Sequence, residues 1–183
     1  MLAAILETVP TEELVVVDDV TLRDIGPGEV RVKIAHSGVC HSDLSVMNGT
    51  IPQEPPAVLG HEGAGVVVDV GDGVTHVAPG DHVIIAFSPP CGVCPFCTGR
   101  HQPNLCMTGL VLMSTNMQFR QGDRVVGSMT GCGTFAEETI VPGIAVIKID
   151  KDVPLDVAAL IGCGVTTGVG AALNTAQVTP GSS

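Results

Sequence analysis

Four cysteines lie close together near the middle of the chain, at Cys91, Cys94, Cys97 and Cys106. Short turns between the first three and a loop of eight residues before the fourth can bring four thiolates around one tetrahedral zinc ion. Because four thiolates leave no open position, such an ion would hold a loop in place without taking part in a reaction. In the bacterial ferredoxin pattern, by contrast, the fourth cysteine follows about three residues after the third and is followed by proline. Here the gap is longer and Met107 follows Cys106, which favours zinc over an iron–sulfur cluster.

A second set of metal-binding residue types is dispersed over the segments Cys40–Asp43, Gly60–Glu62 and Gly162–Gly164. Each segment alone is weak evidence, because a lone histidine or cysteine is more often a buried structural residue. Together they offer two cysteines and one histidine, the ligand set of an open catalytic zinc with a fourth position for water or substrate. The carboxylates of Asp43 and Glu62 would then orient the imidazole and tune the metal.

The composition excludes several classes of function. The 183 residues, enough for one domain, carry 8 Lys and Arg against 19 Asp and Glu, a net charge of −11, so no basic surface for nucleic acid or anionic lipid is expected. Trp and Tyr are absent and Phe occurs only four times, which argues against stacking on bases. We find no signal peptide and no apolar run long enough to cross a membrane. An odd number of cysteines, seven, favours metal binding in a reducing compartment. We therefore expect a cytoplasmic protein without nucleic-acid or membrane partners.

Short β-strands separated by Gly, Pro and Asp must position these candidate ligands. The alternation of Val30, Val32 and Ile34 with charged residues predicts a strand with one buried face. Several more strands at short intervals indicate a mainly β fold, a closed or nearly closed barrel. These further strand predictions rest on β-branched residues and span Glu13–Val17, Gly65–Val70, His82–Phe87, Phe135–Val141 and Ala145–Ile149.

The segment that carries most of the cysteines, Pro89–Gly133, is predicted to be irregular. Beyond it, Asp152–Pro154 has the composition of a helix start. Helix is expected over Leu155–Leu173, with a break near Gly162–Gly164.

One glycine pattern, Gly131–Ala136, fits G-x-G-x-x-A. A dinucleotide fingerprint must open a helix after a strand, whereas the residues that follow read as a strand ended by Pro142. We interpret the pattern as a tight turn, and we expect Cys132 within it to be a buried or free thiol.

The order of these motifs resembles that of the zinc-dependent medium-chain alcohol dehydrogenases. The sequence C-H-S-D from Cys40, G-H-E-x-x-G from Gly60, the cysteine run from Cys91 and G-C-G-V-T-T-G from Gly162 occur in the family's order. The resemblance implies a GroES-like catalytic domain over 1–183: a mainly β, partly closed barrel with a few helices and an irregular zinc lobe at about 89–110. It also implies two zinc ions per chain, one catalytic and one structural.

The resemblance assigns a role to each matching residue. Glu62 would lie close behind the catalytic metal, Asp43 would hydrogen-bond the ligand histidine, and Ser42 would accept the proton of the alcohol. The implied zinc ligands are Cys40, His61 and Cys163 at the catalytic ion, and Cys91, Cys94, Cys97 and Cys106 at the structural ion.

Three further positions match substrate or cofactor contacts of the family. His41 stands where a basic residue faces the pyrophosphate of the dinucleotide, and Thr167 where a threonine touches the nicotinamide. Phe87 stands where the family has a wall of the substrate pocket, which Ser42 also lines.

Two departures from the family pattern stand out. Many relatives have a histidine three residues after the proton-accepting hydroxyl, as the outer end of a proton relay, whereas this chain has Ser45. The dinucleotide-binding Rossmann domain should begin just after Ser183, so we expect it and the C-terminal return segment to be absent.

The implied activity is oxidation of an alcohol to an aldehyde or ketone, with hydride transfer to NAD(P)+ and a small-molecule substrate. We expect the 183 residues alone to be inactive and the full-length enzyme to be a homodimer or homotetramer. The sequence does not choose among alcohols or between NAD and NADP. Two alternatives are a zinc-lobe interaction module without catalysis and an iron–sulfur electron-transfer protein.

Overall fold

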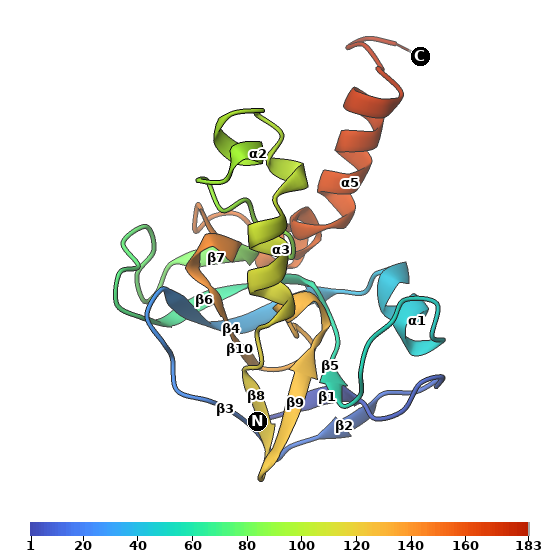
Figure 1. The fold of residues 1–183 in the computed structure, drawn as a ribbon, viewed down its shortest axis with the longest axis vertical. Coiled ribbons are helices and arrows are strands. Elements are labelled where there is room, and N and C mark those ends of the chain that lie inside the picture. Colours follow the sequence, from blue (N-terminus) through green and yellow to red (C-terminus); the bar gives the residue numbers. More distant parts are fainter. Residues whose placement is uncertain (183) are drawn as a thin grey trace.

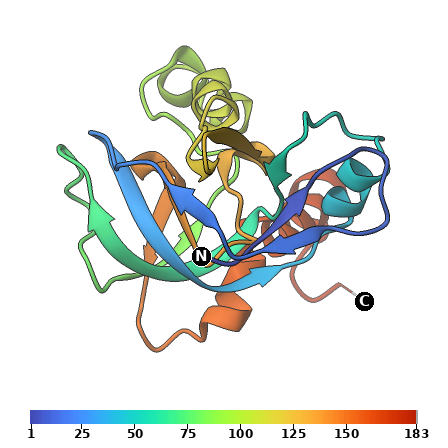
Figure 2. The ribbon, with the colours of Figure 1, turned by 90° about the horizontal axis from the view of Figure 1, so that it is seen from below.

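Two curled sheets make up most of the molecule in the computed structural model, which describes residues 1–182 (Figure 1). The strands curve around a shared interior (Figure 2), so the prediction of a mainly β, partly closed barrel is confirmed. The strands are β1 (Ala3–Leu6), β2 (Val15–Val17), β3 (Val20–Leu22), β4 (Glu29–Gly38), β5 (Ala57–Val58), β6 (Glu62–Val70), β7 (His82–Ile85), β8 (Phe119–Gln121), β9 (Arg124–Ser128), β10 (Glu138–Pro142) and β11 (Val146–Ile149).

The five-stranded sheet has the order β10-β4-β6-β7-β11 and is antiparallel throughout. Strand β4 has the predicted period of two: Val30 and Val32 are fully buried, whereas Lys33 is exposed. Two register shifts in the β4–β6 ladder mark bulges, which increase the local twist and help the sheet to curl. The largest apolar cluster lies against this sheet and includes Met113 from outside it and the thiol of Cys132, both fully buried.

The six-stranded sheet has the order β2-β1-β5-β9-β8-β3 and is parallel only between β5 and β9. Its apolar face centres on Ile5 and Phe119, which are fully buried. A bridge between Ala3 and Ala136 joins this sheet to the segment that leads into β10. The residues 135–137 therefore link the sheets, and the predicted strand Phe135–Val141 begins only at Glu138.

Helices are short and lie at the periphery. Ala158 and Ala159 pack on Ala64 and Ile84 of the five-stranded sheet. The predicted helix after Leu155 is confirmed with its break: the chain turns at Cys163, and the next helix projects from the body toward the C-terminus (Figure 1). The helical segments are α1 (His41–Met47), α2 (Pro95–Thr98), η1 (Pro103–Leu105), α3 (Met107–Ser114), η2 (Met129–Gly131), η3 (Gly143–Ala145), α4 (Leu155–Ala159), η4 (Leu160–Gly162), α5 (Gly164–Gly170) and η5 (Ala171–Thr175).

No single helix among residues 1–182 has the length and apolar composition to cross a membrane. One pair of helical segments, Leu155–Gly162 and Gly164–Thr175, reaches that length and composition only when the two are counted together, and the pair is bent by 54°.

The prediction that Pro89–Gly133 is irregular was wrong in part. The segment includes the regular helix α3 and the hairpin of β8 and β9. Helix α3 reads M-T-G-L-V-L-M-S and is apolar on every side, so it has no polar face to reveal a helical period. The hairpin strands are three and five residues long, too short for a clear alternation.

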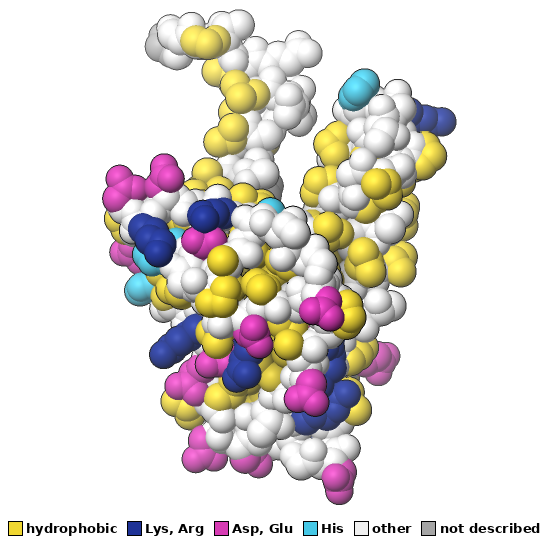
Figure 3. Space-filling model, turned by 90° about the vertical axis from the view of Figure 1, so that its left-hand side faces the viewer, with side chains coloured by type: hydrophobic (Ala, Val, Ile, Leu, Met, Phe, Trp, Pro, Cys, Tyr) yellow, Lys and Arg dark blue, Asp and Glu magenta, His cyan; other side chains and the backbone are white. Residues whose placement is uncertain are grey.

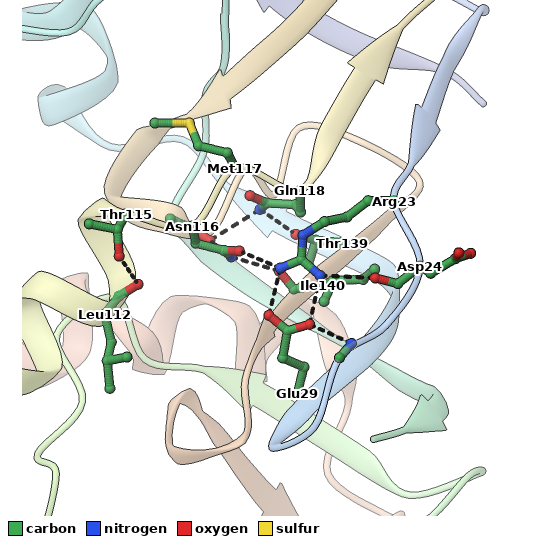
Figure 4. Close-up of polar contacts among 12 residues, drawn as sticks. Arg23, Asp24, Glu29, Leu112, Thr115, Asn116, Met117, Gln118, Thr139 and Ile140 are labelled. Carbon is green, nitrogen blue, oxygen red and sulfur yellow. Dashed lines mark hydrogen bonds and ion pairs between the residues drawn. The ribbon is translucent and has the colours of Figure 1, made fainter. Parts of the chain in front are cut away.

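A polar network fixes the chain where it leaves α3 (Figure 4). Arg23 forms a two-pronged ion pair with Glu29, and one of its nitrogens also donates to Asn116 at 3.2 Å. Asn116 donates in turn to the carbonyl oxygen of Ile140, and Gln118 donates to Thr139. These bonds anchor the start of the hairpin to β10, and so hold the cysteine-bearing segment to the barrel.

Candidate functional site

The four clustered cysteines converge, as their spacing predicts. The sulfur atoms of Cys91, Cys94, Cys97 and Cys106 all lie within 4.8 Å of one another, with Cys94 and Cys97 3.5 Å apart. Ligand atoms of a tetrahedral zinc lie roughly 3.5 Å apart, given bond lengths of about 2.0–2.3 Å. The cluster therefore has the size and the donor set for one zinc ion, with all four positions taken by sulfur.

Backbone N–H groups surround this cluster and favour the thiolate form. The Cys106 sulfur accepts from the amides of Cys91 and Gly109, at 3.2 and 3.3 Å, and so caps the start of α3. A hydrogen bond from the backbone amide of Val93 is the main cause that lowers the pKa of Cys91 to about 6. Hydrogen bonds from backbone amides also lower the pKa of Cys106. Burial and the neighbouring thiols raise the pKa of Cys97 to about 11. The cluster thus stabilises some thiolates but needs a cation to hold four.

The dispersed residues also converge, from three different parts of the fold. Cys40 follows β4 and precedes α1, His61 and Glu62 stand at the start of β6, and Cys163 lies at the break between η4 and α5. One ligand atom from each of these four residues lies within 4.8 Å of those of the others. Glu62 is thus a member of the cluster itself.

Asp43 joins two of the loops that carry these ligands. Its carboxylate is 2 % exposed and accepts from the backbone N–H of Cys40 at 2.9 Å and of Gly60 at 3.0 Å. One of its oxygens also lies 3.5 Å from Nδ1 of His61, a buried nitrogen with no hydrogen-bond partner in the described part of the chain. Since Nδ1 faces Asp43, Nε2 is the nitrogen available to a metal. The carboxylate can therefore orient the imidazole, as predicted for it.

Gly60 is required by its backbone and its surroundings. Its φ is +85°, and a Cβ there would lie 2.5 Å from side-chain atoms of both Phe135 and Thr134. Only glycine fits such a left-handed, crowded position without strain. This glycine sets the path of the chain into His61.

Cys40, His61 and Cys163 differ in the protonation state that their surroundings favour. Burial raises the pKa of Cys163 to about 12, helped by the nearby Cys40 and Glu62. Burial acts in the same direction on Cys40, but hydrogen bonds from Ser42 and the proximity of His61 outweigh it and lower the pKa of Cys40. Burial lowers the pKa of His61, but Asp43 and Cys40 outweigh it and the net pKa is raised. Two thiols and a carboxylate crowded this closely gain a common partner when a divalent cation binds.

A cavity of about 440 Å³ lies beside Cys163, between the lobe and α5. In Figure 3 the two projections stand apart with a hollow between them. The ring of Phe87 meets the edge of the His61 ring at 82°, with centroids 5.6 Å apart. Thr167 lines the same cavity, so the structure brings together two of the predicted substrate and cofactor contacts. The lining has no charged residue and is mostly apolar: Ile84, Ala86, Phe87, Ser88, Asn104, Ile147, Ile161, Gly162, Cys163, Thr166 and Thr167.

Helix α1 presents the remaining predicted residues. The Ser42 hydroxyl oxygen lies 3.5 Å from the Cys40 sulfur, at the edge of the cluster. His41 is exposed, and its Nδ1 lies 3.2 Å from the hydroxyl oxygen of Ser45 one turn later. Ser45 therefore does not continue a proton relay from Ser42. Its hydroxyl contacts His41 instead.

Sequence reasoning missed Asn104 and Thr166, which line the cavity from two different elements. Asn104 belongs to η1 in the lobe and Thr166 to α5. No local pattern marks Asn104, because it reaches the cavity only through the way the lobe folds back on the barrel. Thr166 lies within the motif G-C-G-V-T-T-G, but the resemblance assigns a contact only to its neighbour Thr167.

Comparison with known proteins identifies the class. Residues 26–151 match the family model described as alcohol dehydrogenase GroES-like domain, so the chain belongs to this family. The resemblance to the medium-chain alcohol dehydrogenases is thereby confirmed.

Individual relatives agree with this assignment. Over 171 residues the chain is 46% identical to an S-(hydroxymethyl)glutathione dehydrogenase of Photobacterium damsela subsp. piscicida, covering 87% of this chain and 46% of that protein. It is 45% identical over 162 residues to putative alcohol dehydrogenase D of Mycobacterium tuberculosis, covering 85% and 44%. The chain thus spans about half the length of the curated relatives it matches.

Solved structures share the fold over the whole chain. An alcohol dehydrogenase zinc-binding domain protein from Burkholderia ambifaria matches with a TM-score of 0.88 at 32% identity, covering 100% of this chain and 50% of that one. Benzyl alcohol dehydrogenase from Acinetobacter calcoaceticus matches with a TM-score of 0.82, also at 32% identity and with the same coverage.

Proposed function

We propose that residues 1–183 form the catalytic, GroES-like domain of a zinc-dependent alcohol dehydrogenase, with a structural zinc lobe at about 89–110. The observation that carries this proposal is the dispersed cluster of Cys40, His61, Glu62 and Cys163, whose member Cys163 lines an apolar cavity. Two thiols, an imidazole and a carboxylate suit zinc, whose common ligands are sulfur, nitrogen and oxygen.

Cys40, His61 and Cys163 would hold the catalytic ion, and Cys91, Cys94, Cys97 and Cys106 the structural ion. A bound zinc would supply Lewis acidity toward an alcohol oxygen, and a nicotinamide dinucleotide would accept hydride.

The chain's own residues prepare the site for this reaction. Asp43 holds the His61 ring through Nδ1 and the Gly60 backbone. The hydroxyl of Ser42 lies beside the cluster, where it would accept the substrate's proton while passing its own proton to water. Phe87 shields one side of the cavity from water, which strengthens the electrostatic interactions inside it.

The cavity favours an uncharged alcohol as substrate. Its lining has no Lys or Arg to pair with an anionic group, and the net charge of −11 repels anions at longer range. Two of the named relatives act on S-(hydroxymethyl)glutathione and benzyl alcohol by their names, and the apolar lining suits the second class better. The cytoplasmic location, the choice of NAD or NADP and the homodimeric or homotetrameric state of the full-length enzyme remain predictions.

Replacement of zinc by Co²⁺ tests the proposal, because cobalt reports its ligands in visible absorption. We expect benzyl alcohol to shift the spectrum of the cobalt-loaded chain and to leave that of the His61→Ala variant, with cobalt only in the lobe, unchanged. An unshifted wild-type spectrum at saturating alcohol would contradict an open site that receives alcohols. We also expect no steady NADH production from the 183 residues with benzyl alcohol and NAD+; steady production would show that the chain needs no further cofactor contacts.

A further inference from the structure

Helix α1 carries a histidine–serine pair that the reaction described above does not use. Nδ1 of His41 and the hydroxyl oxygen of Ser45 are 3.2 Å apart, one helical turn from each other. The two residues differ in exposure: Ser45 is 9 % exposed, whereas His41 is open to solvent. The serine is thus the fixed, buried end of the pair.

The hydrogen-bonding needs of Ser45 decide which atom donates. A hydroxyl has one proton to give, and a buried hydroxyl normally gives it to an acceptor. Among the described residues, Nδ1 of His41 is the one partner of the Ser45 hydroxyl. If Nδ1 carried the proton, the hydroxyl could accept it but would have nothing to donate to. Donation from Ser45 to Nδ1 satisfies both groups.

This direction fixes the tautomer of the neutral ring. When Nδ1 accepts a hydrogen bond, the ring proton resides on Nε2. Nε2 of His41 makes no hydrogen bond within residues 1–182 and His41 is exposed, so Nε2 offers a free N–H to solvent. An N–H of this kind donates to the oxygens of a phosphate without any charge on the imidazole.

We infer that Ser45 is a positioning residue: its buried hydroxyl locks His41 in the tautomer and orientation that present Nε2–H to the pyrophosphate oxygens of a dinucleotide. The inference rests on the proposed function, with His41 in the place that the family resemblance implies for it, facing that pyrophosphate. It gives Ser45 a role of its own in place of the relay histidine that many relatives carry at this position.

The tautomer can be measured directly on the 183-residue chain with zinc bound. Long-range ¹H–¹⁵N correlation spectra of the imidazoles distinguish a protonated from a bare ring nitrogen. Spectra are recorded at about pH 8.5, two units above the reference pKa of imidazole, and His41→Gln assigns the signals of His41. We expect the Nε2–H form to exceed the other by about tenfold in the wild type, and to approach the ratio of the exposed His101 in Ser45→Ala. Ser45→Thr keeps a hydroxyl and should retain the wild-type tautomer ratio. Ser114→Ala, which removes an exposed hydroxyl bonded to a backbone carbonyl, should leave the ratio unchanged.

A titration with NAD+, followed by the shifts of the His41 signals, tests the ligand. We expect Ser45→Ala to weaken binding by about 2–10-fold, the effect of one modest hydrogen bond, with inorganic pyrophosphate showing the same order of variants. Mixed tautomers in the wild type, or a ratio unchanged by Ser45→Ala, would overturn the positioning role and leave the proposed function intact. A locked tautomer whose signals respond to neither NAD+ nor inorganic pyrophosphate, which needs no nicotinamide or adenine contacts, would overturn the assigned ligand and leave the zinc sites of the proposed function untouched. The wild-type spectrum decides the first point even if Ser45→Ala fails to fold.

Discussion

The two candidate metal clusters use similar chemistry but arise from different levels of structure. The lobe cluster takes its four sulfur atoms from one stretch, Cys91 to Cys106, and its backbone amides come from that stretch and from Gly109 just after it. The dispersed cluster takes its ligands from Cys40 to Cys163 and depends on β4, β6, α1 and the break before α5. A metal can organise the first locally, whereas the second exists only once the barrel has folded. Substitutions in the barrel should therefore affect the dispersed site alone, and substitutions in the lobe should leave it intact.

The largest effect on the free energy of unfolding of the barrel is expected at Gly60. Gly60→Ala forces alanine into a left-handed conformation, about 1–2 kcal/mol, and overpacks Phe135 and Thr134, about 1–3 kcal/mol more. Gly73→Ala is the matched control, because Gly73 has nearly the same φ, +86°, with nothing within 4 Å of its Cβ. We expect urea unfolding to show a loss at Gly60 larger by the overpacking alone, together with loss of zinc from the dispersed site. Equal losses in the two variants would contradict the crowding.

Removal of one lobe ligand should disrupt the lobe and leave the dispersed site intact. Cys106→Ala deletes a sulfur that also caps α3, so we expect one zinc ion to be lost and proteolysis to begin within residues 89–118. Because structural zinc contributes about 10–16 kcal/mol to the folding of small zinc domains, the lobe should not stay ordered without it. Cys132→Ala removes a buried thiol outside both clusters and should keep both ions. Loss of both zinc ions in Cys106→Ala would show that the sites depend on each other.

An intermediate effect is expected at Asp43. Asp43→Asn keeps the shape of the side chain but removes the charge that faces His61 and an acceptor for the Cys40 or Gly60 amide. We expect zinc affinity of the dispersed site to fall about 10–100-fold, as for other residues that orient metal ligands, in competition with a chelating dye. Asp69→Asn changes an exposed carboxylate that accepts only from its neighbour Val70 and should have no effect. A lobe affinity that fell in parallel would contradict local action.

The smallest effect concerns the tie between lobe and barrel. Hydrogen bonding to Arg23 lowers the pKa of Glu29, so the folded state favours the carboxylate. This stabilisation is fully present above the ordinary pKa of a glutamate, about 4.3, and is lost as the pH falls through the lower pKa of the folded state. Because the pair is partly exposed, Glu29→Gln should cost about 0.5–1 kcal/mol at pH 7. Urea unfolding from pH 7 to pH 3 should show that difference shrink; a cost that grows toward acid pH would reverse the assignment.

How much could be predicted from the sequence follows the same division. The spacing of Cys91, Cys94 and Cys97 is a local signal, and so is the alternation in β4, so both were predictable. The break at Cys163 was marked by flanking glycines. The apolar helix α3 and the short hairpin carry no period and were missed.

Side-chain partnerships were the least predictable part. The Ser45–His41 pair follows a four-residue spacing within α1 that was not recognised, whereas the position of Glu62 inside the dispersed cluster and the place of Asn104 in the cavity depend on how separate elements pack. No spacing in the sequence encodes the latter two positions. Motif order gave the identity of the residues, and only the fold gave their contacts.

Metal content per chain tests the central claim most directly. The protein is desalted without chelator, quantified by amino-acid analysis because Trp and Tyr are absent, and measured by plasma mass spectrometry beside the His61→Ala variant. We predict close to two zinc ions per wild-type chain and close to one in His61→Ala. One zinc ion in both proteins would contradict the dispersed site, and iron in place of zinc would contradict the account of both clusters.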